Sequence, residues 1–483
     1  MQANTRRRRP MRAAAATLLV LLLAAGSPAM AGAGPGEVIS FGRFGDVVVN
    51  RPQTPARDFV LFVSGDGGWN LGVVSMAQRL TAQGAIVAGI DIRHYLAQLE
   101  QSSDKCVSPA VDFENLSHYL QARLGIRQYL QPTLVGYSSG ATLVYATLVE
   151  APDGLFKGAL SIGFCPDLDL KKPVCKGSGI EAAPRRDAHG VLKGVNFLAA
   201  KHLPGRWISL QGELDEVCPA QPTRDFIATV PGGEVVMLPH VGHGYSVQKN
   251  WLPQYEAAFA RLVTAPPAAQ ARPLPAPVAD LPLTVVPAAA GTTSAWFGVF
   301  LSGDGGWVGL DRGVSDELAR RGIPVIGWDS LKYFWTPRTP AGASQDLDRV
   351  LRHYAGAWNK SHALLIGYSQ GADTMPFMVN RLPAATRTMV GLTTLLGLSD
   401  SALFEFHVTN WLGNPAGGLP TAPELAAWHG SPYLCLFGED DGDAACGQPT
   451  GRDGSAVKMA GGHHFGGSYD EIAGEIFKHL PPL

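Results

Sequence analysis

The feature that most constrains this 483-residue chain is an internal repeat. The segment from Phe59 to Trp69, which ends in Ser-Gly-Asp-Gly-Gly-Trp, returns between Phe297 and Trp307 with the same ending. In each copy an apolar run leads into this loop, and a helical pattern and a second apolar run follow. Such self-similarity indicates a duplicated unit. The length also exceeds what one hydrophobic core usually serves, so we predict two related domains.

A second motif is repeated further along the chain. Residues 133–141 read Thr-Leu-Val-Gly-Tyr-Ser-Ser-Gly-Ala, and residues 364–372 read Leu-Leu-Ile-Gly-Tyr-Ser-Gln-Gly-Ala. Each half alternates strand and helix patterns, which predicts an α/β fold with a mainly parallel sheet covered by helices. A Gly-x-Ser-x-Gly turn between a strand and a helix is typical of the nucleophile elbow of α/β-hydrolases. We therefore expect two tandem α/β-hydrolase-type domains.

The N-terminal segment predicts export. It combines an arginine cluster with an apolar run of about 13 residues and the small-residue site Ala29-Met-Ala31, as in a cleavable signal peptide. That run is too short to span a bilayer. A proline- and alanine-rich tract between the repeats predicts a semi-rigid linker. The expected divisions are a signal peptide at 1–31, a first domain at 32–264, a linker at 265–277 and a second domain at 278–483.

Charge and cysteine content narrow the function further. Without the five leader arginines, 34 basic residues face 41 acidic ones, a net charge of −7 that argues against nucleic-acid binding. Six cysteines in an exported chain predict disulfides. If each domain is self-contained, Cys435 pairs with Cys446, while the other four cysteines allow three pairings. We find no metal-binding or nucleotide-binding motif and expect no cofactor.

The first half offers one set of residues for nucleophilic catalysis. Ser138 lies in the elbow motif, Asp215 follows a strand pattern, and His243 follows the next one. Serine, acid and histidine occur in this chain order in α/β-hydrolases. Ser138, Asp215 and His243 are therefore the candidate nucleophile, orienting acid and base.

The second half presents the same order with more than one choice. Ser369 is the candidate nucleophile, and Asp441 is the favoured acid, with Asp443 as an alternative in the same turn. Counting from the preceding strand favours His464 as the base. The string Gly-Gly-His-His leaves His463 open as the alternative.

An acyl-transfer site also needs two N–H donors for the oxyanion. One should be the amide after the nucleophile, Ser139 or Gln370. The other should be the backbone N–H of Asp66 or Asp304 in the repeated loop. A carboxylate there is unfavourable beside an oxyanion, so it faces a substrate cation or caps the following helix. Asp373 is a second acidic candidate for substrate binding.

The second half resembles a known family. The segments Ser330-Leu-Lys-Tyr-Phe-Trp335, Gly367-Tyr-Ser-Gln-Gly-Ala-Asp373 and Asn380-Arg-Leu-Pro383 are similar to those of the VirJ/AcvB bacterial virulence proteins. The resemblance covers most of 281–483, and the two-domain arrangement is similar to the longer AcvB type. It implies a periplasmic protein that hydrolyses the lysyl or alanyl ester of aminoacyl-phosphatidylglycerol at the membrane surface. It also implies a link to virulence and to type IV secretion proteins.

We therefore expect a serine ester hydrolase with a Ser-Asp-His triad. Because the family-like segments lie in the second half, Ser369, Asp441 and His464 are expected to carry the reaction. Two alternatives stay open, since a fold does not dictate a function. One is a general periplasmic esterase or thioesterase. The other is a non-catalytic binding or chaperone factor for type IV secretion.

Overall fold

The computed structural model describes residues 1, 36–175, 179–264, 274–406, 418–442, 444–447 and 454–482. Chain contacts separate residues 1–35 from residues 36–483, and the second of these units holds both repeats. The expected signal peptide, apart from its first residue, and positions 265–273 of the expected linker lie outside the described residues. The domain boundaries thus stay predictions, and each repeat is described by itself.

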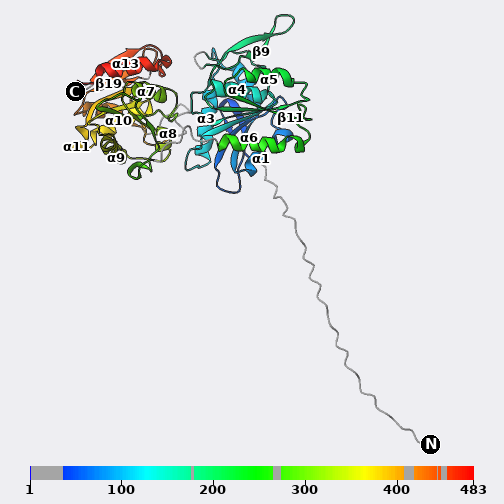
Figure 1. Ribbon diagram of the computed structural model, residues 1–483, viewed down its shortest axis with the longest axis horizontal. Coiled ribbons are helices and arrows are strands. Elements are labelled where there is room, and N and C mark those ends of the chain that lie inside the picture. The colour runs from blue at the N-terminus through cyan, green and yellow to red at the C-terminus, as the bar shows by residue number, and fades with distance from the viewer. Residues whose placement is uncertain are drawn as a thin grey trace. The chain divides into compact units, whose positions relative to one another are not determined.

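The first repeat is built on an eight-stranded sheet in the order β1-β2-β4-β3-β5-β6-β10-β11. Figure 1 shows this repeat in blue to green, with helices beside its strands. β1 pairs antiparallel with β2, β2 pairs antiparallel with β4, and the remaining neighbouring strands of this sheet are parallel. The strands are β1 (Glu37–Phe41), β2 (Gly45–Asn50), β3 (Asp58–Val63), β4 (Ala85–Ile90), β5 (Pro132–Tyr137), β6 (Gly158–Ile162), β10 (Arg206–Gly212) and β11 (Gly233–Leu238).

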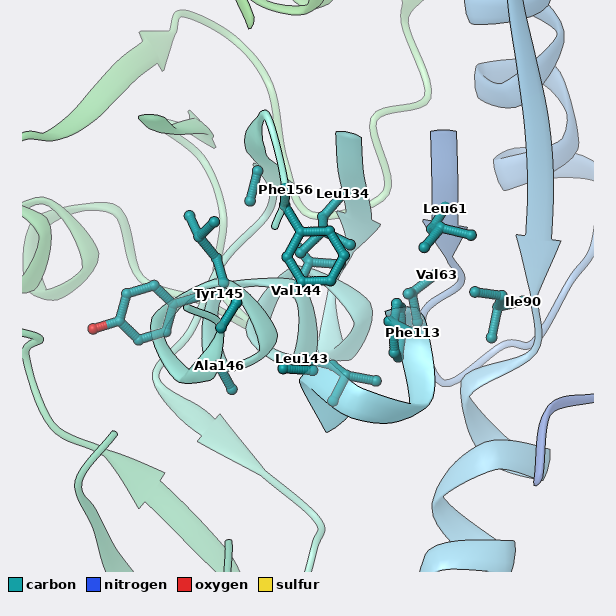
Figure 2. Packing of buried hydrophobic residues seen from close by; sticks show 14 of the residues in the cluster. Leu61, Val63, Ile90, Phe113, Leu134, Leu143, Val144, Tyr145, Ala146 and Phe156 are labelled. Atoms are coloured by element: carbon teal, nitrogen blue, oxygen red, sulfur yellow. The ribbon is translucent and has the colours of Figure 1, made fainter. Parts of the chain in front are cut away.

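Helices cover both faces of this sheet. Alternate residues of β3 point to opposite sides, as strand geometry requires: Leu61 and Val63 join one buried cluster, while Val60 and Phe62 join another. Figure 2 shows Leu61 and Val63 packed near residues of α3 and α4. The helices are α2 (Ile92–Gln101), α3 (Pro109–Arg123) and α4 (Ser139–Glu150) on the first side, α1 (Leu71–Ala82) and α6 (Leu252–Val263) on the second, and α5 (Ala220–Ala228) beside β10 and β11.

The second repeat has the same plan on a seven-stranded sheet, in the order β12-β14-β13-β15-β16-β19-β20. Only β12 is antiparallel to its neighbour. Its strands are β12 (Leu283–Val286), β13 (Trp296–Leu301), β14 (Val325–Trp328), β15 (His362–Tyr368), β16 (Val390–Leu396), β19 (Tyr433–Gly438) and β20 (Gly454–Met459). Its helices are α7 (Gly309–Arg320), α8 (Ser330–Phe334), α9 (Pro340–Trp358), α10 (Gln370–Asn380), α11 (Ala384–Arg387), α12 (Thr421–Ala426) and α13 (Tyr469–His479).

Two small sheets complete the described structure. β7 (Asp167–Leu168), β9 (Leu192–Phe197) and β8 (Ala182–Arg186) form one between β6 and β10 of the first repeat. β17 (Ser401–Ala402) and β18 (Leu419–Pro420) form the other in the second repeat. No helix of the described residues is long and apolar enough to cross a membrane.

The predicted fold class is confirmed, because both large sheets are mainly parallel and carry helices on both sides. The predicted Cys435–Cys446 disulfide is also confirmed. Of the three pairings open in the first half, the structure has Cys106–Cys175 and Cys165–Cys218.

The elbow of each repeat depends on glycines that bring the strand against the helix. A Cβ at Gly367 would lie 2.4 Å from the carbonyl oxygen of Gly371, and a Cβ at Gly371 would lie 2.3 Å from that of Leu301. No Cβ can approach a backbone oxygen so closely. These glycines are required by packing, in contrast to Gly356 of α9, around which the space is open.

This contrast gives a prediction within one repeat. Gly371→Ala should destabilise the second repeat by about 1–3 kcal/mol or more, because backbone must shift to admit the methyl group. Gly356→Ala, on the exposed side of a helix, should stabilise it by about 0.5–1 kcal/mol. Calorimetry of the full chain measures both changes. Equal effects of the two substitutions would contradict the packing argument.

Candidate active sites

Both elbow serines adopt the strained backbone of a nucleophile elbow. Ser138 has φ 56° and ψ −125°, and Ser369 has φ 50° and ψ −120°. A non-glycine residue pays an energetic cost for a positive φ, and the surrounding structure must hold it there. The backbone N–H of Ser138 donates to Ile162, and that of Ser369 donates to Leu396. Each serine thus sits at the tight turn where a central strand meets the next helix.

The first repeat assembles a continuous hydrogen-bond chain. The hydroxyl of Ser138 lies 2.8 Å from Nε2 of His243, and Nδ1 of His243 lies 2.8 Å from Oδ2 of Asp215. Asp215 is only 5% exposed, whereas His243 is half-buried. With its acid shielded and its histidine open toward the serine, this arrangement can accept a proton from the hydroxyl.

The topology of the sheet explains how distant residues meet here. Asp215 follows β10 and His243 follows β11, and these two strands are parallel neighbours with Gly212 opposite Leu238. The carboxyl ends of parallel strands lie at one edge of the sheet, where α/β proteins place their sites. The N–H of Leu214 donates to Val241, which joins the acid loop to the histidine loop.

The second repeat pairs a different histidine with the acid. Nδ1 of His463 lies 2.9 Å from Oδ2 of Asp441, whereas Nδ1 of His464 lies 2.7 Å from the hydroxyl of Tyr368. The expected pairing of Asp441 with His464 is therefore corrected to His463. The alternative acid, Asp443, lies outside the described residues.

The cause of this difference is the length of one loop. The segment between β20 and His463 is one residue shorter than the segment between β11 and His243. Counting from the strand therefore overshoots by one position. A better cue was present: a glycine precedes each paired histidine, and an aromatic residue with positive φ follows two places later, Tyr245 at 46° and Phe465 at 52°.

Among the described residues, the hydrogen-bond chain of the second repeat is incomplete between the serine and the histidine. Asp441 is hydrogen-bonded to His463, but within the described residues no hydrogen bond joins the Ser369 hydroxyl to His463. The structure thus brings Ser138, Asp215 and His243 together completely. It brings only the acid and base together in the second repeat.

The repeated loop lies next to each elbow serine. A Cβ at Gly65 would be 2.9 Å from the Cβ of Ser138, and one at Gly303 would be 3.5 Å from that of Ser369. Ser139 is the first residue of α4, so its N–H has no acceptor within the helix. In the described residues the N–H of Asp66 has no protein acceptor either. Both amides of the first repeat are available to an oxyanion.

The carboxylates of the two loops have different surroundings. Asp66 is exposed, whereas Asp304 is half-buried. Burial raises the pKa of the Asp304 carboxyl, and its own N–H, that of Gly305 and the charge of His463 partly offset the shift. The Asp304 carboxyl therefore lies in a more desolvated environment than the Asp66 carboxyl.

The capping interpretation of these aspartates is wrong. The N-cap of α1 is Asn70, whose side chain accepts the N–H of Gly72 at 3.3 Å. The N-cap of α7 is Val308, and no side chain caps that helix. Neither Asp66 nor Asp304 takes the position, so a counter-charge for a substrate cation is the interpretation that stays open for Asp66.

Two further residues of the second repeat are tied to the protein. The side chain of Gln370 donates to the carbonyl of Leu403 at 3.2 Å. Asp373 is 8% exposed and accepts the N–H of Ser399 at 2.7 Å. Burial raises the pKa of Asp373 well above its usual range. We expected Asp373 at the mouth of the site, but the structure places it under the loop that follows β16.

Sequence reasoning missed two residues of the first site. Gln211 donates its side-chain N–H to Oδ2 of Asp215 at 3.2 Å, and Tyr137 donates its hydroxyl to the carbonyl of His243 at 2.7 Å. Gln211 was detectable as an amide within an otherwise apolar strand pattern. Among the described residues no group of three His, Cys, Asp or Glu side chains is placed to hold a metal ion.

The family follows from comparison with known sequences. A model of the bacterial virulence protein VirJ matches residues 57–157 and 295–482, which is more than half of the chain. The chain belongs to the VirJ family. The resemblance stated from the sequence is thereby confirmed, and the match includes both copies of the repeated loop and both elbows of this VirJ-family chain. No curated protein matches it.

Solved structures resemble parts of this chain. An α/β serine hydrolase without a lid from Xanthomonas campestris is 18% identical, with a TM-score of 0.31 over 48% of this chain and 94% of that one. Esterase 2 of Thermogutta terrifontis with butyrate bound is 17% identical, with a TM-score of 0.34 over 48% and 95%. An esterase domain from Rhodothermus marinus is 15% identical, with a TM-score of 0.32 over 47% and 98%.

The histidine assignment in the second repeat can be tested by labelling. In a Ser138→Ala chain, a fluorophosphonate probe reports on Ser369 alone. His463→Ala should lower the labelling rate at least about a hundredfold, as loss of a general base does, while His464→Ala should leave it nearly unchanged. The reverse order would restore His464 as the base.

Proposed function

We propose that this VirJ-family chain is a serine ester hydrolase and that its first repeat carries the reaction. The observation that supports this most directly is the unbroken chain from Ser138 through His243 to Asp215, with both links at 2.8 Å. The same residues lie beside two available backbone amides. The arrangement contains the nucleophile, base, acid and oxyanion donors that acyl transfer requires.

The proposed reaction proceeds in two halves. The Ser138 hydroxyl attacks the ester carbonyl while His243 takes its proton, and the amides of Ser139 and Asp66 hold the oxyanion. The protonated His243, stabilised by Asp215, then gives the proton to the leaving alcohol, and an acyl-serine is left. Water attacks this acyl-serine with His243 again as the base, which releases the acid and restores the Ser138 hydroxyl.

We propose aminoacyl-phosphatidylglycerol, with lysine or alanine as the amino acid, as the substrate. The resemblance of this two-domain chain to the AcvB type of the family supports this choice. The exposed carboxylate of Asp66 supports it too, because a carboxylate beside an oxyanion hole is unfavourable unless a cation is present. The α-ammonium group of an aminoacyl ester is such a cation. The leaving group is then phosphatidylglycerol.

The proposed location is the periplasmic face of the membrane. The predicted signal peptide supports export, and three disulfides in the described residues fit an oxidising compartment. The lipid substrate would be met at the membrane surface. Type IV secretion proteins stay possible partners that the family resemblance suggests.

The serine that carries hydrolysis is tested with vesicles of phosphatidylglycerol that contain lysyl-phosphatidylglycerol. Ser138→Ala should lower lysine release by about a thousandfold or more, because loss of the nucleophile disables the whole catalytic unit. Ser369→Ala should leave most of the release intact.

Each other outcome has a defined meaning. If Ser369→Ala is the inactive variant, the sequence-based expectation for Ser369 is right and the first repeat becomes the recognition partner. Hydrolysis of p-nitrophenyl butyrate without lysine release would indicate a general esterase. No hydrolysis and no fluorophosphonate labelling of either serine would contradict an enzyme and favour a binding role.

The role proposed for Asp66 gives a separate prediction. Asp66→Asn keeps the backbone N–H but removes the charge, so KM for alanyl-phosphatidylglycerol should rise by up to about fivefold, the range of an exposed ion pair. KM for p-nitrophenyl butyrate, which has no ammonium group, should not change. Equal changes for both esters would show that the carboxylate does not recognise the amino group.

A further inference from the structure

The acid of the first site accepts an unusually complete set of hydrogen bonds. Oδ2 of Asp215 faces both His243 and the side-chain amide of Gln211. Oδ1 accepts the backbone N–H groups of Val217 at 3.0 Å and Cys218 at 2.8 Å. The carboxylate is therefore fixed in orientation by the loop that carries it, and the position of Cys218 sets the position of one donor.

Packing alone does not hold this loop. Glu213, Leu214, Glu216 and Val217 are exposed, so most of the loop faces solvent. Leu214 and Val217 are 61% and 65% exposed although both are aliphatic. Only Asp215 and Cys218 point inward and are buried. A loop with so little buried surface needs another constraint to hold a carboxylate in one orientation.

A disulfide and the side-chain hydrogen bonds of Gln211 supply that constraint. Cys218 forms a disulfide with Cys165, which lies in the segment after β6. The carbonyl of Cys165 accepts the hydroxyl of Thr142 from α4 at 2.5 Å, so the disulfide connects the acid loop to the helix of the elbow. Gln211 adds a second link, because its amide also donates to the carbonyl of Cys218 at 2.7 Å.

Gln211 is held there at a cost to stability. Its side chain is fully buried, and its carbonyl oxygen has no hydrogen-bond partner in the described structure. A buried acceptor without a partner destabilises a fold. Stability therefore does not explain why a glutamine occupies this position. Both of its N–H hydrogen bonds end at residues of the acid loop, which favours a role in holding that loop.

The second repeat builds its acid loop differently. The position of Gln211 is taken there by Phe437, which has no donor for Asp441. Its disulfide joins Cys446 to Cys435 of the adjacent strand β19 rather than to the segment after β16. Among the described residues, the N–H of Ala445 donates to the carbonyl of Leu398 and joins the acid loop to that segment. The glutamine and the cross-linking disulfide of the first repeat have no counterpart at the matching positions of the described second repeat.

We infer that Gln211 and the Cys165–Cys218 disulfide are positioning groups that hold the acid Asp215 against His243, and that hydrolysis at Ser138 depends on them. This inference rests on the proposed function. Neither group touches the ester. Each acts through Asp215, so its loss should lower kcat and leave substrate binding unchanged.

The test uses the full chain with Ser369→Ala, so that hydrolysis of p-nitrophenyl butyrate reports on Ser138. Cys165→Ala with Cys218→Ala should lower kcat by up to about a hundredfold, the effect of misplacing a group by about 1 Å, with KM unchanged. The control is Cys106→Ala with Cys175→Ala. That disulfide closes a loop of similar length, with a sequence separation of 69 against 53, and should leave kcat unchanged.

A second variant separates positioning from folding. Gln211→Met removes both N–H bonds and the unpartnered oxygen, so kcat should fall about tenfold while the melting temperature does not fall. Gln254→Met is the control, because Gln254 also has a buried oxygen without a partner but lies on α6. Gln254→Met should leave kcat unchanged and should not lower the melting temperature. If the Cys165→Ala, Cys218→Ala variant does not fold, the kcat of the Gln211→Met variant tests the positioning role by itself.

The outcomes distinguish this inference from the proposed function. Unchanged kcat in the Gln211→Met chain, or a loss of kcat no larger than in the two controls, would overturn the positioning role alone. An inactive Ser369→Ala parent would instead overturn hydrolysis at Ser138, and the positioning role with it.

Discussion

Both repeats depend on one close contact, the approach of the elbow helix to the central strand. In the first repeat a Cβ at Gly136 would lie 2.1 Å from the carbonyl oxygen of Gly140, and a Cβ at Gly140 would lie 2.4 Å from that of Ser64. Only glycine permits this approach. It forces the intervening serine to a positive φ and sets its hydroxyl at the carboxyl edge of the sheet. The acid and histidine proposed for catalysis can act on the serine only because it is fixed there.

The two repeats share a fold but differ in how completely the serine, histidine and acid are joined by hydrogen bonds. Both repeats have the strained serine and a paired acid and histidine, yet among the described residues only the first repeat joins all three by hydrogen bonds. The differences lie at the strand ends and in the loops around the site: β10 has Gln211 where β19 has Phe437, and Asp304 is half-buried where Asp66 is exposed. The sheets set where a site can form, and the residues at the strand ends and in the loops decide how completely it forms.

Much of this architecture was predictable from the sequence. The repeated loop and elbow motifs identified two α/β units, because alternating strand and helix patterns have few packing solutions. The helical pattern and the second apolar run that follow the first copy of the loop are α1 and β4. The motif order predicted which loops carry the acids and histidines. The Cys435–Cys446 bond followed from having two cysteines in one half.

What could not be predicted depends on distances across the fold. A one-residue difference in loop length determines that His463, and not His464, pairs with the acid. Counting residues from the end of the preceding strand does not reveal this difference. Asp373 was expected to bind the substrate near the mouth of the site, but its helix faces the core and buries it. Gln211 bonds to a residue four places away only because the chain turns after Gly212. Such contacts can be identified only when the three-dimensional arrangement of the loops is known.

The central claim is that Ser138 is the reactive nucleophile. The most direct measurement is peptide mass spectrometry of the unmodified chain after brief exposure to a fluorophosphonate, with the occupancy of both serines quantified. We expect the adduct to form first on Ser138, since its hydroxyl is already 2.8 Å from Nε2 of His243. An adduct on Ser369 with Ser138 unmodified would contradict it.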